Sequence, residues 1–256
     1  MKSPDRKAWL AGGNARCSNP PNPPQDQPWR LVLLGPPGVG KGTQAEILST
    51  RLNACHLSTG DVLRAAACAG TASSPSLEAA LVAMHRGELV SDDVMMNIVG
   101  ERGRCLRCCG GFILDGYPRT IDQAVALDSQ LAMESVAIDA VFNYELPPDE
   151  IVTRLAGRLV CPSCKAVYNV KNKSPQREGI CDKCGKPLVQ REDDKPESIR
   201  IRLEAYESTN RAILDWYARK GLLINVPAHG SPEEIYVRTW TCGRVPAPAD
   251  PALPAG

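Results

Sequence analysis

The amino-acid sequence predicts an α/β protein in which a mostly parallel sheet of about five strands is covered by helices. Short apolar runs alternate with segments of helical periodicity, and this alternation is typical of strands buried between two layers of helices. A glycine-rich loop directly follows the first apolar run, at residues 35–42. A cysteine-rich segment at residues 158–191 interrupts the alternation, so we predict that it is an inserted module.

The first run, at residues 29–34, ends in a Gly/Pro cluster, as a buried strand does before a tight loop. The remaining predicted strands are apolar runs at residues 54–57, 111–115, 140–144 and 222–226.

Helical patterns lie between these runs. Residues 41–52 carry apolar side chains at helical spacing, and residues 197–219 do so among charged positions. The last helix begins at Ser231-Pro-Glu-Glu, which supplies an N-cap, a proline at the first helical position and acidic residues in the first turn.

The composition is that of a soluble globular protein, with 43% hydrophobic and 23% charged residues. A chain of 256 residues suits one compact domain with insertions, or two small ones. The formal net charge of +1 argues against a nucleic-acid or membrane partner. No apolar run approaches the roughly 18–20 residues that span a bilayer.

Both ends of the chain are expected to be disordered. Residues 1–28 include a proline-rich stretch, and their apolar patch at residues 8–11 is too short for a secretory signal. A transit peptide is the alternative, which the prolines disfavour because they oppose an amphipathic helix. Residues 244–256, rich in proline and alanine, are predicted to be a similar tail. Eleven cysteines, an odd number without a signal peptide, indicate a reducing compartment, and we expect the cytoplasm.

The glycine-rich loop, Gly35-Pro-Pro-Gly-Val-Gly-Lys41-Gly-Thr43, matches the phosphate-binding pattern G-x-x-x-x-G-K-[ST], except that Gly42 separates Lys41 from Thr43. Glycines let the backbone approach phosphate oxygens closely, and the following helix presents its positive dipole end to the same anion. Lys41 supplies a mobile cation for the outer phosphates. A strand precedes the loop and a helix follows it, as the pattern requires.

The insert carries two C-x-x-C pairs, Cys161/Cys164 and Cys181/Cys184, with sixteen residues between them. This spacing is typical of a zinc ribbon, in which each pair contributes two thiolates to one tetrahedral Zn²⁺. Four protein ligands leave no open coordination position, so we predict a structural metal. A disulfide-linked or metal-free cluster is the alternative.

Other cysteines and the histidines carry less information. Cys105 and Cys108 form a further C-x-x-C pair beside Cys109, but no second pair lies nearby, so we expect thiols rather than a metal site. No catalytic role is predicted for the scattered histidines His56, His85 and His229.

Three ordered tracts resemble the adenylate kinase family: the loop, in its G-x-P-G-x-G-K-G-T form, Ser58-Thr-Gly-Asp-Val-Leu-Arg64, and Gly111-Phe-Ile-Leu-Asp-Gly-Tyr-Pro-Arg119. The insert resembles the lid of long-form bacterial members, although Asn172 stands where these have an aromatic residue. The resemblance implies a P-loop NTPase-type core, a lid, and a helical flap that binds the nucleoside monophosphate. The corresponding residues are 29–157 and 192–243 for the core, 158–191 for the zinc-binding lid and 58–90 for the flap.

The resemblance also implies the residues of the site. Those expected to be catalytic are Lys41, Asp115, Arg119, Arg158, Arg191 and Arg202. Those expected to bind ATP are Gly35, Gly38, Gly40, Lys41, Gly42, Thr43, Arg154 and Arg158. Those expected to bind AMP are Thr59, Arg64, Gly116, Arg119, Gln123, Arg191 and Arg202. Asp115 resembles the aspartate that orients waters on Mg²⁺, and Asp193 and Asp194 resemble an acidic pair near the lid hinge.

The implied reaction is reversible transfer of a phosphoryl group from MgATP to AMP, giving two ADP, by a monomer. Thr59 and the long insert favour AMP, since UMP/CMP kinases usually carry a small residue in place of the threonine and lack the insert. Another acceptor or donor, such as UMP, CMP or GTP, is the alternative within the enzyme class. A zinc-ribbon nucleic-acid-binding protein with a regulatory P-loop is disfavoured by the near-neutral charge. A catalytically inactive relative is disfavoured because the expected residues are present.

Overall fold

The computed structural model describes residues 6–17, 28–70, 72–86, 88–164, 166–170, 173–191 and 194–242. Asn172, Asp193 and the predicted tail 244–256 therefore lie outside the described residues.

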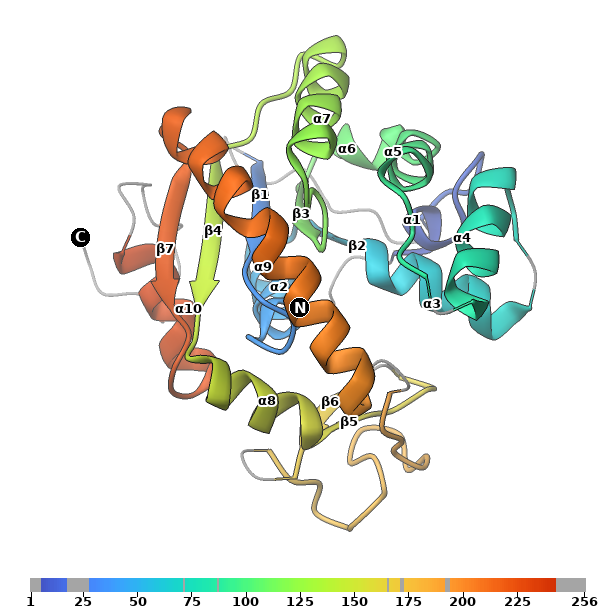
Figure 1. The fold of residues 1–256 in the computed structure, drawn as a ribbon, viewed down its shortest axis with the longest axis vertical. Coiled ribbons are helices and arrows are strands. Elements are labelled where there is room, and N and C mark those ends of the chain that lie inside the picture. Colours follow the sequence, from blue (N-terminus) through green and yellow to red (C-terminus); the bar gives the residue numbers. More distant parts are fainter. Residues whose placement is uncertain are drawn as a thin grey trace.

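A five-stranded sheet forms the centre of the molecule, with the strand order β2-β3-β1-β4-β7 and all neighbours parallel (Figure 1). This confirms the predicted fold class. The strands are β1 (Trp29–Leu34), β2 (Cys55–Ser58), β3 (Gly111–Asp115), β4 (Ala140–Glu145) and β7 (Leu223–Pro227). Because they are parallel, their carboxyl ends lie at one edge of the sheet, which is where ligands bind in open α/β folds.

Helices cover both faces of the sheet because side chains alternate along each strand. Leu31 and Leu33 of β1 pack in a core with α2 (Lys41–Leu52) and α10 (Pro232–Thr241). Val32 and Leu34 face the opposite way, into the core formed with helices that include α5 (Asp92–Gly100), α7 (Ile121–Met133) and α9 (Pro196–Arg219). The remaining helices are α1 (Lys7–Ala11), α3 (Thr59–Ala69), α4 (Pro75–His85), α6 (Gly103–Leu106) and α8 (Pro148–Ala156).

Side-chain caps begin several of these helices. The Ser231 hydroxyl accepts a hydrogen bond from the Glu234 backbone N–H, and the Glu234 carboxylate accepts one from the Ser231 backbone N–H at 2.7 Å. This capping box confirms the predicted start of the last helix. Ser58 and Ser74 cap α3 and α4 with one such hydrogen bond each, accepted from the backbone N–H of Asp61 and of Leu77.

Two smaller parts project from the core. The helices α3 and α4 lie side by side beyond β2 (Figure 1) and occupy the region predicted as a flap. The inserted module lies below α8 and the start of α9 in the view of Figure 1, and its β5 (Arg158–Val160) and β6 (Val167–Asn169) form a short antiparallel pair.

None of the helices in the described ranges combines the length and apolar character that crossing a membrane requires.

The prediction of disorder over residues 1–28 is wrong for residues 6–17. Residues 7–11 form α1, and Trp9 is buried, with 1% of its surface exposed. The burial of one large aromatic side chain contributes enough free energy to order a short segment that has little regular structure of its own.

Candidate active site

Residues 35–40 of the predicted glycine-rich loop join β1 to α2 at the carboxyl edge of the sheet, and residues 41 and 42 form the start of α2. Two of the loop glycines cannot be replaced without distortion. Gly35 has φ +129°, and a Cβ there would lie 2.4 Å from the carbonyl oxygen of Tyr144. Gly38 has φ +85°, and a Cβ there would lie 2.5 Å from the Leu155 side chain. The loop therefore packs closely against β4 and α8, which fixes its backbone for contact with an anion.

Lys41 is the first residue of α2, and its side chain folds back over the loop. The Nζ donates to the carbonyl oxygens of Gly35 and Pro36, at 2.6 and 2.9 Å. Removal from water lowers the pKa of Lys41 to about 7; Asp115 opposes this shift, and the charges of Arg119, Arg202 and Arg158 add to it. The structure therefore brings these five predicted residues into one electrostatic field. A site so rich in positive charge is suited to a polyphosphate.

Asp115 ends β3 and faces the start of α2, since a Cβ on Gly42 would lie 3.5 Å from its Oδ2. The Nε2 of buried His56 lies 3.3 Å from the same oxygen. Burial alone would raise the pKa of Asp115, but the hydrogen bond with His56 and the charges of His56, Lys41 and Arg64 outweigh it, and the pKa falls to about 2. Asp115 is therefore a carboxylate at neutral pH. The sequence assigned no role to His56, and only the pairing of β2 with β3 reveals its contact.

A buried aspartate holds two of the predicted arginines. The Arg158 guanidinium makes two hydrogen bonds to the carboxylate of Asp194, one of them at 2.7 Å, and the Arg202 Nη1 lies 3.5 Å from the same carboxylate. The Asp194 side chain is fully buried, so these guanidinium groups compensate its charge. Asp194 therefore joins β5 of the insert to α9.

Arg154 and Arg191 lie on either side of the insert. Arg154, near the end of α8, donates to the carbonyl oxygens of Val39 in the loop and Ala228 after β7, at 3.1 and 3.0 Å. Its guanidinium therefore spans these two segments. The carbonyl oxygen of Arg191 accepts a hydrogen bond from the Asp194 backbone N–H at 3.1 Å.

Three predicted AMP residues meet where β3 turns into the following loop. The Thr59 hydroxyl donates to the Gly116 carbonyl oxygen at 3.1 Å, and the Arg119 Nε donates to the same oxygen at 2.8 Å. Arg64, one turn into α3, donates to Asp61 at 2.7 Å. The structure thus brings Thr59, Gly116 and Arg119 together, with Arg64 at the base of the flap.

Gln123 is 3% exposed, and its amide bonds within the protein. Its Oε1 accepts from the Arg119 backbone N–H at 2.8 Å, and its Nε2 donates to Asp92 at 2.7 Å. The sequence did not identify Asp92, which also accepts from the Thr120 hydroxyl at 2.6 Å. The arrangement fixes the backbone at Arg119, and recognition of AMP by Gln123 stays a prediction.

The four predicted metal ligands, Cys161, Cys164, Cys181 and Cys184, have sulfur atoms that all lie within 4.8 Å of one another. This spacing fits tetrahedral Zn²⁺, for which zinc–sulfur bonds of about 2.3 Å place the sulfurs just under 4 Å apart. The apolar core of the insert is small: two of these cysteines pack with Ala166, Tyr168 and a few partly buried side chains.

The remaining C-x-x-C pair, Cys105 and Cys108, is not part of a potential metal-binding group. In the described part of the chain, the lid cysteines are the one group of three or more potential ligands that meets this distance criterion. Cys108 instead lies beside Cys55, with 3.4 Å between their sulfur atoms, and both are free thiols.

Comparison with known proteins agrees with this geometry. A family model described as adenylate kinase matches residues 33–222. The chain is 47% identical to the adenylate kinase of Thermodesulfovibrio yellowstonii over 207 residues, which cover 81% of this chain and 95% of that protein. It is 45% identical to that of Carboxydothermus hydrogenoformans, with the same coverage, and 42% identical to that of Streptomyces griseus over 210 residues, 82% of this chain and 94% of the relative. The agreement extends over most of its length, and the chain therefore belongs to the adenylate kinase family of nucleoside-monophosphate kinases.

Proposed function

We propose that the protein transfers the γ-phosphoryl group of MgATP to AMP, reversibly, to give two ADP. The observation that carries this proposal is the shared electrostatic field of Lys41, Asp115 and three arginines beside the glycine-rich loop. Phosphoryl transfer requires positioning of the two substrates and neutralisation of charge on the transferred group, and these residues provide both. The names of the relatives support AMP as the acceptor.

The donor is expected to lie along the glycine-rich loop. The backbone of the loop and the first turn of α2 would bind its phosphates, and Lys41 would move from the loop carbonyls to the outer phosphates. Arg154, which already spans the loop and the segment after β7, would lie against the adenine ring. The loop and helix residues assigned to ATP are Gly35, Gly38, Gly40, Gly42 and Thr43.

The acceptor is expected to lie between the flap and the loop that follows β3. Arg64 and Arg119 would bind the phosphate of AMP, since each guanidinium can make two parallel hydrogen bonds to it. Thr59, Gly116 and Gln123 would border its base.

Asp115 fits a Mg²⁺ site because it is a carboxylate at neutral pH beside the start of α2. A Mg²⁺ held there would neutralise part of the charge on the donor phosphates. Asp115 would hold the metal through its water ligands.

Closure of the lid is expected to exchange the partners of its arginines. Arg158 and Arg202 are now held by Asp194. With nucleotide bound, these guanidinium groups and that of Arg191 would turn to the transferred phosphoryl group while Asp194 remains the hinge. The closed lid would exclude water and so suppress hydrolysis of ATP.

Isotope transfer tests the proposed reaction. ATP labelled in its γ-phosphate and mixed with AMP should give ADP that carries the label in its β-phosphate, with little free labelled phosphate. Release of labelled phosphate at the same rate with and without AMP would show that the protein is a hydrolase instead.

The affinity for MgATP is expected to fall as the pH rises above 7. The pKa of Lys41 is lowered to about 7 in the free protein, and a bound polyphosphate favours the ammonium form, so binding requires proton uptake above this pH. The limiting slope is about tenfold in Kd per pH unit between pH 7 and the ordinary pKa of lysine. Calorimetric titration in buffers of different ionisation enthalpy measures this uptake. Lys41→Arg, which stays charged, should abolish it, and uptake that persists in this variant would assign the proton to another group.

We propose that the four lid cysteines bind one structural Zn²⁺. Removing zinc should lower the Tm by several degrees and unfold the lid, because the small apolar core of the insert cannot stabilise it alone. Metal analysis and thermal unfolding of Cys164→Ser and Cys184→Ser check this. Cys68→Ser and Cys242→Ser remove exposed thiols outside the lid and should change neither quantity. Equal Tm values with and without metal would contradict a structural role.

A further inference from the structure

Residues 6–17, here called the N-terminal strap, lie outside the part of the chain that matches the family model, which begins at residue 33. The strap lies against the flap formed by α3 and α4. The Trp9 indole N–H donates to the carbonyl oxygen of Ser58, the N-cap of α3, at 2.9 Å. The Ser73 hydroxyl, between α3 and α4, donates to the Ala11 carbonyl oxygen at 3.1 Å.

The strap is also fixed to the helices behind the flap. Arg102, which is 2% exposed, donates from Nε to the Trp9 carbonyl oxygen at 2.7 Å and from Nη1 to the Ile98 carbonyl oxygen at 2.8 Å. Gly12, with φ +71°, passes so close to Arg102 that a Cβ would lie 3.0 Å from its guanidinium. The strap is therefore a packed part of the structure that contacts both the flap and the core.

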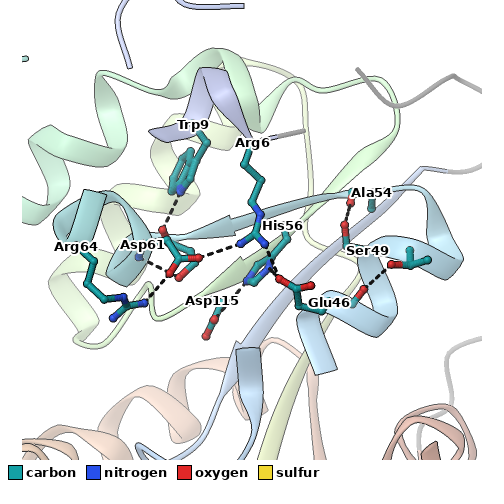
Figure 2. A network of polar contacts seen from close by, with 11 residues as sticks. Arg6, Trp9, Glu46, Ser49, Ala54, His56, Asp61, Arg64 and Asp115 are labelled. Carbon is teal, nitrogen blue, oxygen red and sulfur yellow. Dashed lines mark hydrogen bonds and ion pairs between the residues drawn. The ribbon is translucent and has the colours of Figure 1, made fainter. Parts of the chain in front are cut away.

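Arg6, at the start of the strap, forms ion pairs with one residue of the core and one of the flap (Figure 2). One guanidinium nitrogen lies 2.5 Å from Glu46 of α2, and the other lies 2.9 Å from Asp61 in the first turn of α3. The second carboxylate oxygen of Asp61 accepts from Arg64 at 2.7 Å. The Arg6 and Asp61 side chains are only 23% and 28% exposed, so solvent screens their interaction incompletely.

This geometry affects Arg64, the flap arginine assigned to the acceptor phosphate. Asp61 shares its two oxygens between Arg6 and Arg64, so Arg6 fixes the orientation of the carboxylate. Arg6 also compensates part of the Asp61 charge, which would otherwise act on Arg64 alone. Burial by itself would raise the pKa of Asp61, but the charges of Arg64 and Arg6 outweigh it and lower the pKa, so the carboxylate is ionised.

We propose that Arg6 is a positioning residue for the acceptor: it bridges Glu46 of the core and Asp61 of the flap and so presents Arg64 to the phosphate of the nucleoside monophosphate. This inference rests on the proposed function, because it takes Arg64 to be a phosphate ligand. It assigns to the N-terminal segment a role in acceptor binding and none in donor binding or in the transfer step.

Steady-state kinetics of the full-length chain test this role. Arg6→Ala should raise the KM for AMP about three- to tenfold, as expected for a partly exposed charged contact. The KM for MgATP and kcat should stay within about twofold, since neither the loop nor the lid is touched. Arg6→Lys keeps the charge but not the two-nitrogen bridge and should recover only part of the loss, whereas Arg6→Gln should recover none. Arg51→Ala is the matched control: it removes the ion pair between Arg51, at the other end of α2, and Glu233 of α10, and it should leave the KM for AMP unchanged.

The kinetic results distinguish the positioning role of Arg6 from the proposed function itself. A rise confined to the KM for AMP, and partly reversed in Arg6→Lys, supports the positioning role. An unchanged KM for AMP, or equal changes in both KM values, would overturn it while the proposed function stands. A wild-type protein that does not phosphorylate AMP would overturn the proposed function, and the role of Arg6 in binding that acceptor with it.

Discussion

Replacement of Lys41 by methionine should lower kcat for phosphoryl transfer by about three orders of magnitude, because the variant loses the ammonium group that stabilises negative charge on the phosphoryl group during transfer. The Lys41 ammonium contacts the loop through the carbonyl oxygens of Gly35 and Pro36. It also interacts electrostatically with Asp115 and with three arginines. Its charge is therefore central to the field that the transition state would experience.

The fold should survive this change. The pKa of Lys41 is lowered mainly by its removal from water, so a neutral side chain of similar length should be tolerated at its position. Circular dichroism and the Tm should match the wild type. Lys220→Met is the matched control, since Lys220 directly follows α9 just before β7, at the opposite end of the parallel strands from the loop, and pairs with Asp128 of α7; its kcat should be unchanged. A Lys41→Met enzyme with near-normal turnover would contradict the assignment of the loop as the donor site.

Replacement of Arg119 by alanine should lower kcat/KM for AMP by about two to three orders of magnitude, because a guanidinium that binds phosphate in the transition state would be lost. The Arg119 side chain is exposed and donates from Nε to the Gly116 carbonyl oxygen, so its loss removes little packing. Its backbone N–H keeps the hydrogen bond to Gln123 in any variant. The effect should therefore appear in kinetics and not in stability.

Two further variants sharpen this prediction. Arg119→Lys keeps the charge but loses the paired geometry, and it should recover only part of the activity. Arg107→Ala removes another exposed arginine, one that pairs with Glu134, and it should behave as the wild type. Equal activity of Arg119→Ala and Arg107→Ala would show that Arg119 does not bind the acceptor.

The sequence predicts most of the core because its signals there are local. The strands at residues 29–34 and 111–115 agree with the structure to the residue. The strand predicted at 140–144 extends one residue further, and those predicted at 54–57 and 222–226 begin and end one residue later. Apolar runs bounded by glycine and proline locate such strands well. The strap was missed because residues 8–11 form too short an apolar patch, and tertiary contacts order them: Trp9 is buried and hydrogen-bonded to Ser58 and Arg102.

In the site, too, local motifs predict some residues, and tertiary contacts that the sequence does not predict supply the rest. The motifs locate Lys41, Asp115 and Arg119, which the structure brings together. They do not reveal what supports Asp115 and the flap arginine Arg64, because each support comes from a distant segment: His56 lies beside Asp115, and Arg6 lies beside the Asp61 that holds Arg64. Such contacts depend on how strands and helices are arranged in space, which no local pattern encodes.

The most direct test of the account is the rate of diphosphate formation from MgATP with AMP, CMP, UMP or GMP, with bound zinc measured in the same preparation. The account predicts rapid turnover with AMP, far slower turnover with the other three acceptors, and about one zinc per chain. Preference for CMP or UMP would assign a different acceptor to the same site. No transfer to any monophosphate by the folded, zinc-loaded protein would contradict the central claim that Lys41 and its surrounding arginines form a phosphoryl-transfer site.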